Sequence, residues 1–279
     1  MTGRHSSRAR PRHDGATRVE SPHSPAWSGG DLLVADVSTS KWPSLLVVMR
    51  HAESLATERR RHLEQVNSGD VHLGLDMRDV DVPLTPEGRG HALLTGRRLN
   101  DWGPFDVLYV SPYMRTLQTA EEVLGELMHR PAVIKEERLR EKEWGVLEGL
   151  TKHGIRLRHP DEHERRKRVG KYFYRPPGGE SYADVNLRVH SVIGTLVREH
   201  PGLRVLVITH QVVLLSFRKL LERMDEEDIL ALDRQDEARP ASLLVYELGE
   251  RDGRKGVLVR KYWNLVLYDR AAVPRPATL

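Results

Sequence analysis

The sequence predicts an α/β fold, a three-layer α/β/α sandwich with a mostly parallel central sheet. Two apolar runs, Leu45–Met49 and Val205–Ile208, are short and continuous, which is typical of strands that are buried on both faces. Segments with helical spacing of apolar residues alternate with these and other strands. Such an alternation along a chain favours a parallel sheet with helices on both of its faces.

The first half of the predicted domain begins with the strand at Leu45–Met49. The charged segment Leu55–Val82 follows, and we interpret it as a loop that is long for a strand-to-helix connection. Thr85 as N-cap and Pro86 at the first helical position predict a helix that ends near Asn100. The next elements are a strand at Phe105–Val110, a helix at Met114–Met128 and a short strand at Val133–Ile134.

The second half contains more irregular segments. Leu139–Gly149 has no clear period and is expected to be a loop, while Lys152–Lys171 is strongly charged and is expected to form a helical excursion at the surface. The turn-rich segment Arg175–Ser181 precedes a helix. The remaining predicted elements are helices at Tyr182–Arg198 and Val212–Leu221 and strands at Val205–Ile208, Leu243–Leu248 and Val257–Tyr268.

These elements form one predicted domain, residues 41–270, with a lid insertion at about residues 150–180. Residues 1–40 are rich in Arg, Ser, Pro and Gly without periodicity, and we expect a disordered N-terminal extension. The short apolar patch Asp31–Val37 is a candidate edge strand. Residues 271–279 are expected to form a C-terminal tail.

Composition limits the classes of function. The 279 residues carry a formal net charge of +4 with interspersed charges, which does not by itself imply nucleic acid as a partner. The absence of cysteine excludes disulfides, thiolate metal sites and a cysteine nucleophile. No apolar run approaches the ~20 residues that cross a bilayer. We expect a soluble cytoplasmic protein without membrane or nucleic-acid partners, and the sequence carries no signal for its oligomeric state.

Two histidines follow the two apolar runs directly. His51 comes after Arg50 at the end of the first strand, and His210 comes after Thr209 at the end of the later one. If these strands are neighbours in the sheet, both imidazoles lie at the carboxyl edge, where open α/β sheets place their ligands. An arginine and two histidines at one edge suit an anionic substrate.

The neighbouring residues indicate phosphoryl chemistry. Arg50 and Arg115 are candidate clamps because a guanidinium binds phosphate oxygens through its planar fork and keeps its charge. A neutral imidazole nitrogen can attack phosphorus and form a covalent intermediate, and positive side chains can stabilise that transfer without a metal. The leaving oxygen needs a proton donor, for which Glu141 is the first candidate and Glu143 the alternative.

Six segments in order carry a family resemblance. They are RHAES, PLTPEG, SPYMRTLQTA, LREKEWGVLEG, YRPPGGESYAD and VITHQ, and together they resemble the histidine phosphatase superfamily (phosphoglycerate-mutase-like) over Leu45–Leu248. Within it, the later segments look most like the fructose-2,6-bisphosphatase domain and related phosphatases. The family's usual glycine after the histidine is Ala52 here, and its usual asparagine a few residues later is Thr57.

The resemblance implies roles for particular residues. His51 would be the phosphorylated nucleophile and Glu141 the proton donor. Arg50, Arg115 and His210 would form the phosphate pocket. The residues implied in substrate binding are Thr57, Tyr174, Arg175 and Gln211.

We therefore expect a phosphatase that acts on a small phosphorylated metabolite through a phosphohistidine, with no metal and no cofactor. A phosphoglycerate mutase, which returns the phosphoryl group to the substrate, is one alternative. A non-catalytic module that binds a phosphorylated ligand is the other.

Overall fold

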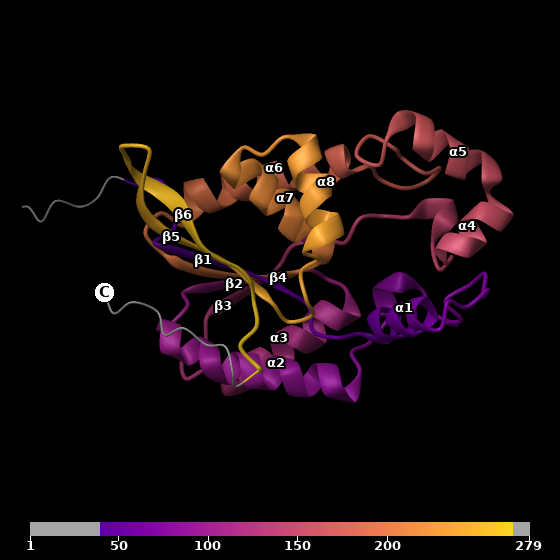
Figure 1. The fold of residues 1–279 in the computed structure, drawn as a ribbon. Helices are drawn as coiled ribbons and strands as arrows, with labels where there is room; N and C mark the ends of the chain where they lie inside the picture. The colour runs from indigo at the N-terminus through magenta and orange to yellow at the C-terminus, as the bar shows by residue number, and fades with distance from the viewer. Residues whose placement is uncertain (1–39, 270–279) are drawn as a thin grey trace, which may run out of the picture. The chain divides into compact units, whose positions relative to one another are not determined.

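A computed structural model describes residues 40–269, which contain six strands and eight α-helices (Figure 1). The strands are β1 (Leu45–Arg50), β2 (Val107–Val110), β3 (Ala132–Lys135), β4 (Arg204–Thr209), β5 (Leu243–Arg251) and β6 (Arg254–Leu265). The helices are α1 (Leu55–Gln65), α2 (Pro86–Leu99), α3 (Met114–Glu126), α4 (Lys152–Arg158), α5 (Pro160–Val169), α6 (Tyr182–Glu199), α7 (Gln211–Glu222) and α8 (Glu226–Gln235).

All six strands form one mixed sheet in the order β3-β2-β4-β1-β5-β6. The four strands from β1 to β4 run parallel, whereas β5 is antiparallel to β1 and β6 is antiparallel to β5. The strands β1 and β4 are neighbours, in a register that places Arg50 opposite Thr209. The predicted α/β sandwich with a mostly parallel sheet is thus confirmed, and the two histidine-bearing strand ends meet.

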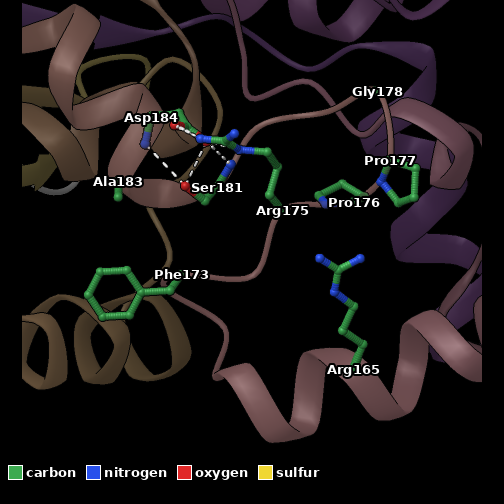
Figure 2. Close-up of a pocket in the computed structure, with 9 residues that line it drawn as sticks. All are labelled: Arg165, Phe173, Arg175, Pro176, Pro177, Gly178, Ser181, Ala183 and Asp184. Atoms are coloured by element: carbon green, nitrogen blue, oxygen red, sulfur yellow. Dashed lines mark hydrogen bonds and ion pairs between the residues drawn. The ribbon is translucent and has the colours of Figure 1, made fainter.

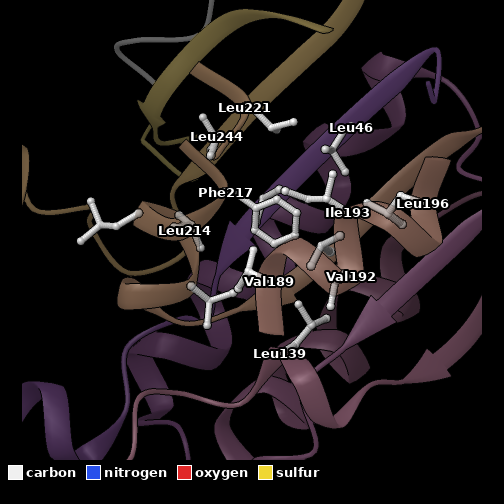
Figure 3. Close-up of a cluster of buried hydrophobic side chains, with 14 of the residues drawn as sticks. Leu46, Leu139, Val189, Val192, Ile193, Leu196, Leu214, Phe217, Leu221 and Leu244 are labelled. Atoms are coloured by element: carbon white, nitrogen blue, oxygen red, sulfur yellow. The ribbon is translucent and has the colours of Figure 1, made fainter. Parts of the chain in front are cut away.

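Helices cover both faces of the sheet (Figure 1). On one face α6 and α7 pack against Leu46 and Val48 of β1, and Phe217 of α7 lies within this apolar cluster (Figure 3). On the other face α2 and α3 pack against the alternate residues of β1, Leu45, Val47 and Met49. Every residue of β1 is buried, as expected for a strand with apolar neighbours on both faces.

The prediction of a loop over Leu55–Val82 is wrong for its first part, which forms α1. The Ser54 side chain caps this helix by accepting a hydrogen bond from the Thr57 N–H. Only Ala56 and Leu63 of α1 are buried, so the charged helix has no apolar stripe that would reveal it. In Figure 1, α1 lies near α4, beyond the end of the sheet from which the chain enters α1, and Lys152 of α4 pairs with Glu64 of α1.

The charged segment Lys152–Lys171 is helical, as expected, and forms α4 and α5. The helix α8 was not predicted; it begins at an Asp225–Asp228 capping box and buries Ile229. The candidate strand Asp31–Val37, nearly all of the predicted extension and the C-terminal tail lie outside the described residues. No helix within residues 40–269 is long and apolar enough to cross a membrane.

Candidate active site

His51 lies at the carboxyl end of β1, where backbone contacts hold it from both sides. Its N–H donates to the Thr209 carbonyl oxygen at 2.8 Å, and its own carbonyl oxygen accepts from the Ala241 N–H at 3.1 Å. Its ring Nδ1 lies 2.7 Å from the Ala52 carbonyl oxygen. Because a carbonyl oxygen can only accept, Nδ1 carries the proton in the neutral ring and Nε2 keeps its lone pair.

His210 faces His51 from the adjacent strand end. The ring centroids are 5.2 Å apart in an edge-to-face arrangement. Nε2 of His210 lies 2.8 Å from the Ser111 hydroxyl at the end of β2, and its Nδ1 is buried without a hydrogen-bond partner among residues 40–269. A buried ring nitrogen without a partner indicates a position that a ligand can occupy.

Both imidazoles are neutral near physiological pH. Burial, followed by the charges of Arg115 and Arg50, holds the pKa of His51 well below its usual value. Burial and the Arg115 charge likewise lower the pKa of His210, with a further contribution from His51. The neutral state leaves His51 able to act as a nucleophile.

Arg50 is buried beside the two rings. Its Nη1 donates to the Ala238 carbonyl oxygen and to Glu237 Oε1, the latter at 3.2 Å. The Glu237 side chain is 64% exposed, so this ion pair is largely solvated. The buried Nε of Arg50 has no partner within residues 40–269 and is therefore a free donor at the site.

Arg115 is buried at the start of α3, and its guanidinium is paired with a carboxylate. Its Nη1 and Nη2 donate to the two Asp79 carboxylate oxygens at 3.2 Å and 3.0 Å, and Nη1 also donates to the Asp79 carbonyl oxygen at 2.6 Å. The guanidinium carbon lies 4.9 Å from the centre of the Tyr113 ring. Sequence reasoning missed Asp79, because it lies in the segment that offered no motif.

Glu141 is half-buried near the same strand ends, and the desolvation of its carboxyl group raises the pKa of that group. Its Oε1 accepts the Lys142 N–H at 2.8 Å, and this contact and the nearby Arg115 oppose the rise without cancelling it. A carboxyl with a raised pKa holds a proton at higher pH than an ordinary glutamate does. Such a group suits donation of a proton to a leaving oxygen.

An arginine that the sequence analysis did not single out holds the backbone around Glu141. Arg188 of α6 donates to the carbonyl oxygens of Arg138 at 2.7 Å and of Glu141 at 3.1 Å. It also forms two hydrogen bonds of 2.9 Å with the Glu180 carboxylate, which accepts the Glu143 N–H at 3.1 Å. The loop is therefore tied to α6 by charged hydrogen bonds.

Glu143, the alternative proton donor, has a different environment. Its Oε1 accepts the Tyr113 hydroxyl at 2.9 Å, and its side chain is 38% exposed. Burial, followed by the charge of Glu143, raises the pKa of Tyr113 well above that of an ordinary phenol, so its hydroxyl stays protonated. Glu143 is thus engaged as an acceptor, and the raised pKa of Glu141 favours that residue as the acid.

Each of the four predicted substrate-binding residues contacts a different partner in the structure. Thr57 lies in the first turn of α1, and its hydroxyl lies 3.0 Å from the Ser54 hydroxyl. The buried Tyr174 donates its hydroxyl to Glu162 of α5 at 2.9 Å. Arg175 pairs with Asp184 of α6 and is mostly exposed. Gln211, next to His210, donates its amide to Asp233 of α8 at 3.3 Å, and its buried Oε1 has no partner within the described part of the chain.

A cavity of about 520 Å³ lies beside the predicted lid (Figure 2). Its lining includes Arg165 of α5, Phe173 and residues of the segment Arg175–Ser181. Its lining contains neither His51 nor His210. It is therefore a separate feature from the strand-edge cluster, which the buried histidines and arginines define. Within residues 40–269 no group of three or more His, Asp or Glu side chains is arranged to hold a metal ion.

Comparison with known proteins shows the family of this chain. The sequence model of the histidine phosphatase superfamily (branch 1) matches residues 46–258. This range includes Arg50, His51, Arg115 and His210 of the strand-edge cluster. The chain belongs to the histidine phosphatase superfamily. Among its relatives is the 2,3-bisphosphoglycerate-dependent phosphoglycerate mutase of Parvibaculum lavamentivorans, 32% identical over 225 residues, which are 78% of this chain and 98% of the relative. The corresponding Rhizobium etli mutase is 31% identical over 199 residues, 68% of this chain and 86% of the relative.

Solved structures of other proteins share the fold. YhfR of Bacillus stearothermophilus superposes with a TM-score of 0.63 at 27% identity, over 80% of this chain and 98% of its own. A mycobacterial glucosyl-3-phosphoglycerate phosphatase superposes with a TM-score of 0.59 at 22% identity, over 79% of this chain and 99% of its own. The two sequence relatives are named as mutases and the mycobacterial structure as a phosphatase, and membership of the superfamily leaves the choice between these activities open.

Proposed function

We propose that this protein is a metal-independent phosphatase that hydrolyses a small phosphorylated metabolite through a phosphohistidine. Nε2 of His51 attacks phosphorus, the ester P–O bond breaks, and the leaving oxygen takes the proton of Glu141. Water then attacks the phosphohistidine and gives a proton to the Glu141 carboxylate. The P–N bond breaks, phosphate leaves, and His51 is neutral again.

The arrangement of His51 is the observation that carries the proposal. A single nitrogen, Nε2, is left with its lone pair because Nδ1 lies against the Ala52 carbonyl oxygen at 2.7 Å. The lowered pKa keeps that lone pair free of a proton. A nucleophile that is fixed in direction and in protonation state loses little entropy on reaching the attacking geometry.

The groups around His51 support stabilisation of the transferred phosphoryl group. The free Nε of Arg50 and the free Nδ1 of His210 are two buried nitrogens that lack partners within residues 40–269. A phosphoryl oxygen can accept from both when the His210 proton lies on Nδ1. Arg115 adds a positive charge near both rings, since that charge lowers the pKa of each.

Phosphoglycerate mutase is the second candidate, because bacterial relatives about one third identical to this chain carry that name. Both activities begin with the same phosphohistidine and differ in whether water or the substrate receives the phosphoryl group. The predicted closeness to the fructose-2,6-bisphosphatase domain, which favours hydrolysis, stays a prediction.

The test is to incubate the purified protein with a panel of phosphate esters, including both phosphoglycerates, in the presence of a chelator. We expect free phosphate and an acid-labile phosphoenzyme, and we expect neither from the His51→Ala variant. Isomerised phosphoglycerate without free phosphate would select the mutase. No phosphate, no isomerisation and no phosphoenzyme would overturn both activities and favour a non-catalytic binding module.

A further inference from the structure

Asp79 occupies the arginine that the proposed mechanism assigns to phosphate. Its two carboxylate oxygens lie 3.2 Å and 3.0 Å from Nη1 and Nη2 of Arg115, so both outer nitrogens of the guanidinium are engaged. The Arg115 side chain is 5% exposed and the Asp79 side chain is 32% exposed. The contact is therefore a forked ion pair, buried on the arginine side and open to solvent on the carboxylate side.

The chemistry of the guanidinium makes this contact significant. Its N–H donors form a planar fork that fits a carboxylate and a phosphate equally in geometry. The same pair of donors cannot hold both anions at once. A phosphoryl group that binds Arg115 through this fork must displace the Asp79 carboxylate.

We propose that Asp79 is an internal competitor for the phosphoryl group, so that substrate and product phosphate bind Arg115 by exchange with its carboxylate. This inference rests on the proposed phosphate-binding role of Arg115. Asp79 is then a residue that sets the affinity of the phosphate subsite. It weakens the binding of substrate and of product phosphate alike, and it shortens the time that product phosphate stays bound.

The surroundings allow the carboxylate to leave while the arginine stays. Two contacts of Arg115 do not involve the carboxylate and can remain. Its guanidinium carbon lies 4.9 Å from the centre of the Tyr113 ring, and its Nη1 donates to the Asp79 carbonyl oxygen at 2.6 Å. The Asp79 backbone is also fixed, since its N–H donates to Glu148 Oε1 at 3.1 Å. Rotation of one partly exposed side chain is therefore enough for the exchange.

The inhibition constants of phosphate and vanadate measure this competition. When a site is free only part of the time, the apparent dissociation constant exceeds the intrinsic one by the inverse of the free fraction. If the fork is free about one tenth of the time, removal of the carboxylate charge in Asp79→Asn should lower both inhibition constants and KM roughly tenfold. Such a gain in affinity is a readout that structural damage would not produce.

The matched control is Asp81→Asn. Asp81 lies in the same short turn and pairs with the exposed Arg78 at 2.6 Å, away from Arg115. Its substitution removes an equal charge and should leave KM and both inhibition constants within about twofold. Equal effects of the two substitutions would indicate general electrostatics and would overturn the inference.

Binding is also measured without turnover, through the rise in melting temperature of each variant with added phosphate. We expect added phosphate to raise the melting temperature of Asp79→Asn and Asp79→Ala more than that of the unmodified protein. Unchanged or weaker affinity in both variants would refute the role of Asp79. If the unmodified protein still hydrolyses esters and binds vanadate, only the role of Asp79 is refuted and the proposed function stands. If the unmodified protein does neither, the proposed function itself is refuted.

Discussion

Glu141→Gln separates proton donation from the other properties of the Glu141 side chain. The amide has nearly the same size as the carboxyl group, and its oxygen can still accept the Lys142 N–H that now lies 2.8 Å from Oε1. It has no acidic proton to give to a leaving oxygen. The raised pKa of Glu141 favours its protonated form, which the neutral amide imitates, so substrate binding should change little.

The size of the effect depends on the leaving group. General acid catalysis contributes roughly 10²- to 10⁴-fold, which corresponds to about 3 to 5 kcal/mol of transition-state stabilisation. An alkyl phosphate, whose leaving oxygen is strongly basic, should lose that full factor in the rate of phosphoenzyme formation. The leaving group of a nitrophenyl phosphate is nitrophenolate, which departs as a stable anion without a proton. The rate of phosphoenzyme formation from this substrate should therefore fall less than about tenfold.

The assay is rapid quenching of a single turnover with each of the two substrates, followed by quantification of the phosphoenzyme. Glu143→Gln is the control, since Glu143 lies in the same loop and its Oε1 accepts the Tyr113 hydroxyl. Equal losses for both substrates in Glu141→Gln would refute proton donation by Glu141. The leaving-group pattern in Glu143→Gln instead would transfer the role to Glu143.

Two further predictions concern the pH dependence and the stability of the fold. Because burial and two arginines lower the pKa of His51 below its ordinary 6.5, the nucleophile stays neutral as the pH falls through that value. Single-turnover phosphoenzyme formation should therefore keep its rate at pH 6.5, and an acidic midpoint above 6.5 would contradict this. In α2, a Cβ at Gly88 would lie 2.0 Å from the Glu53 carbonyl oxygen. Gly88→Ala should therefore lower the free energy of unfolding, measured by urea denaturation, by about 2 kcal/mol or more. Gly90→Ala in the same helix meets open space and should stabilise the protein by about 0.5 to 1 kcal/mol; similar effects of both would show that the close contact is unimportant.

The sheet and its histidines could be predicted because their signals are local. Each apolar run marks a buried strand, and the polar residues that end it, Arg50 and His51 in the first strand, mark the sheet edge. The order of elements predicts a parallel sheet without fixing which strands are neighbours. The register that places Arg50 opposite Thr209 is a property of the whole fold, and the structure was needed to show it.

The exposed helices could not be predicted in the same way. The helix α1 buries only Ala56 and Leu63, so its apolar residues show no helical period. Likewise α8 buries only Ile229, although its Asp225–Asp228 capping box is a signal that the sequence does contain. Surface helices of this kind are stabilised by caps and charges more than by an apolar face.

The partners of the site arginines were also beyond sequence reasoning. Asp79 lies 36 residues before Arg115, in a turn whose position depends on the packing of the chain around α3. The Arg188 contacts that hold the Glu141 loop span 50 and 47 residues. No spacing rule relates residues so far apart, because the relevant geometry exists only after the domain has folded.

The two kinds of site residue are therefore held in different ways, which has a consequence for function. Backbone hydrogen bonds within the sheet fix His51, whereas carboxylates from loops occupy the arginines: Glu237, 64% exposed, for Arg50 and Asp79, 32% exposed, for Arg115. Exchange of one anion for another leaves the buried arginine paired, while displacement of a strand end breaks several buried hydrogen bonds. Substitutions in these loops should thus change the affinity for phosphorylated ligands, and substitutions that disturb the register of β1 and β4 should change the chemical step.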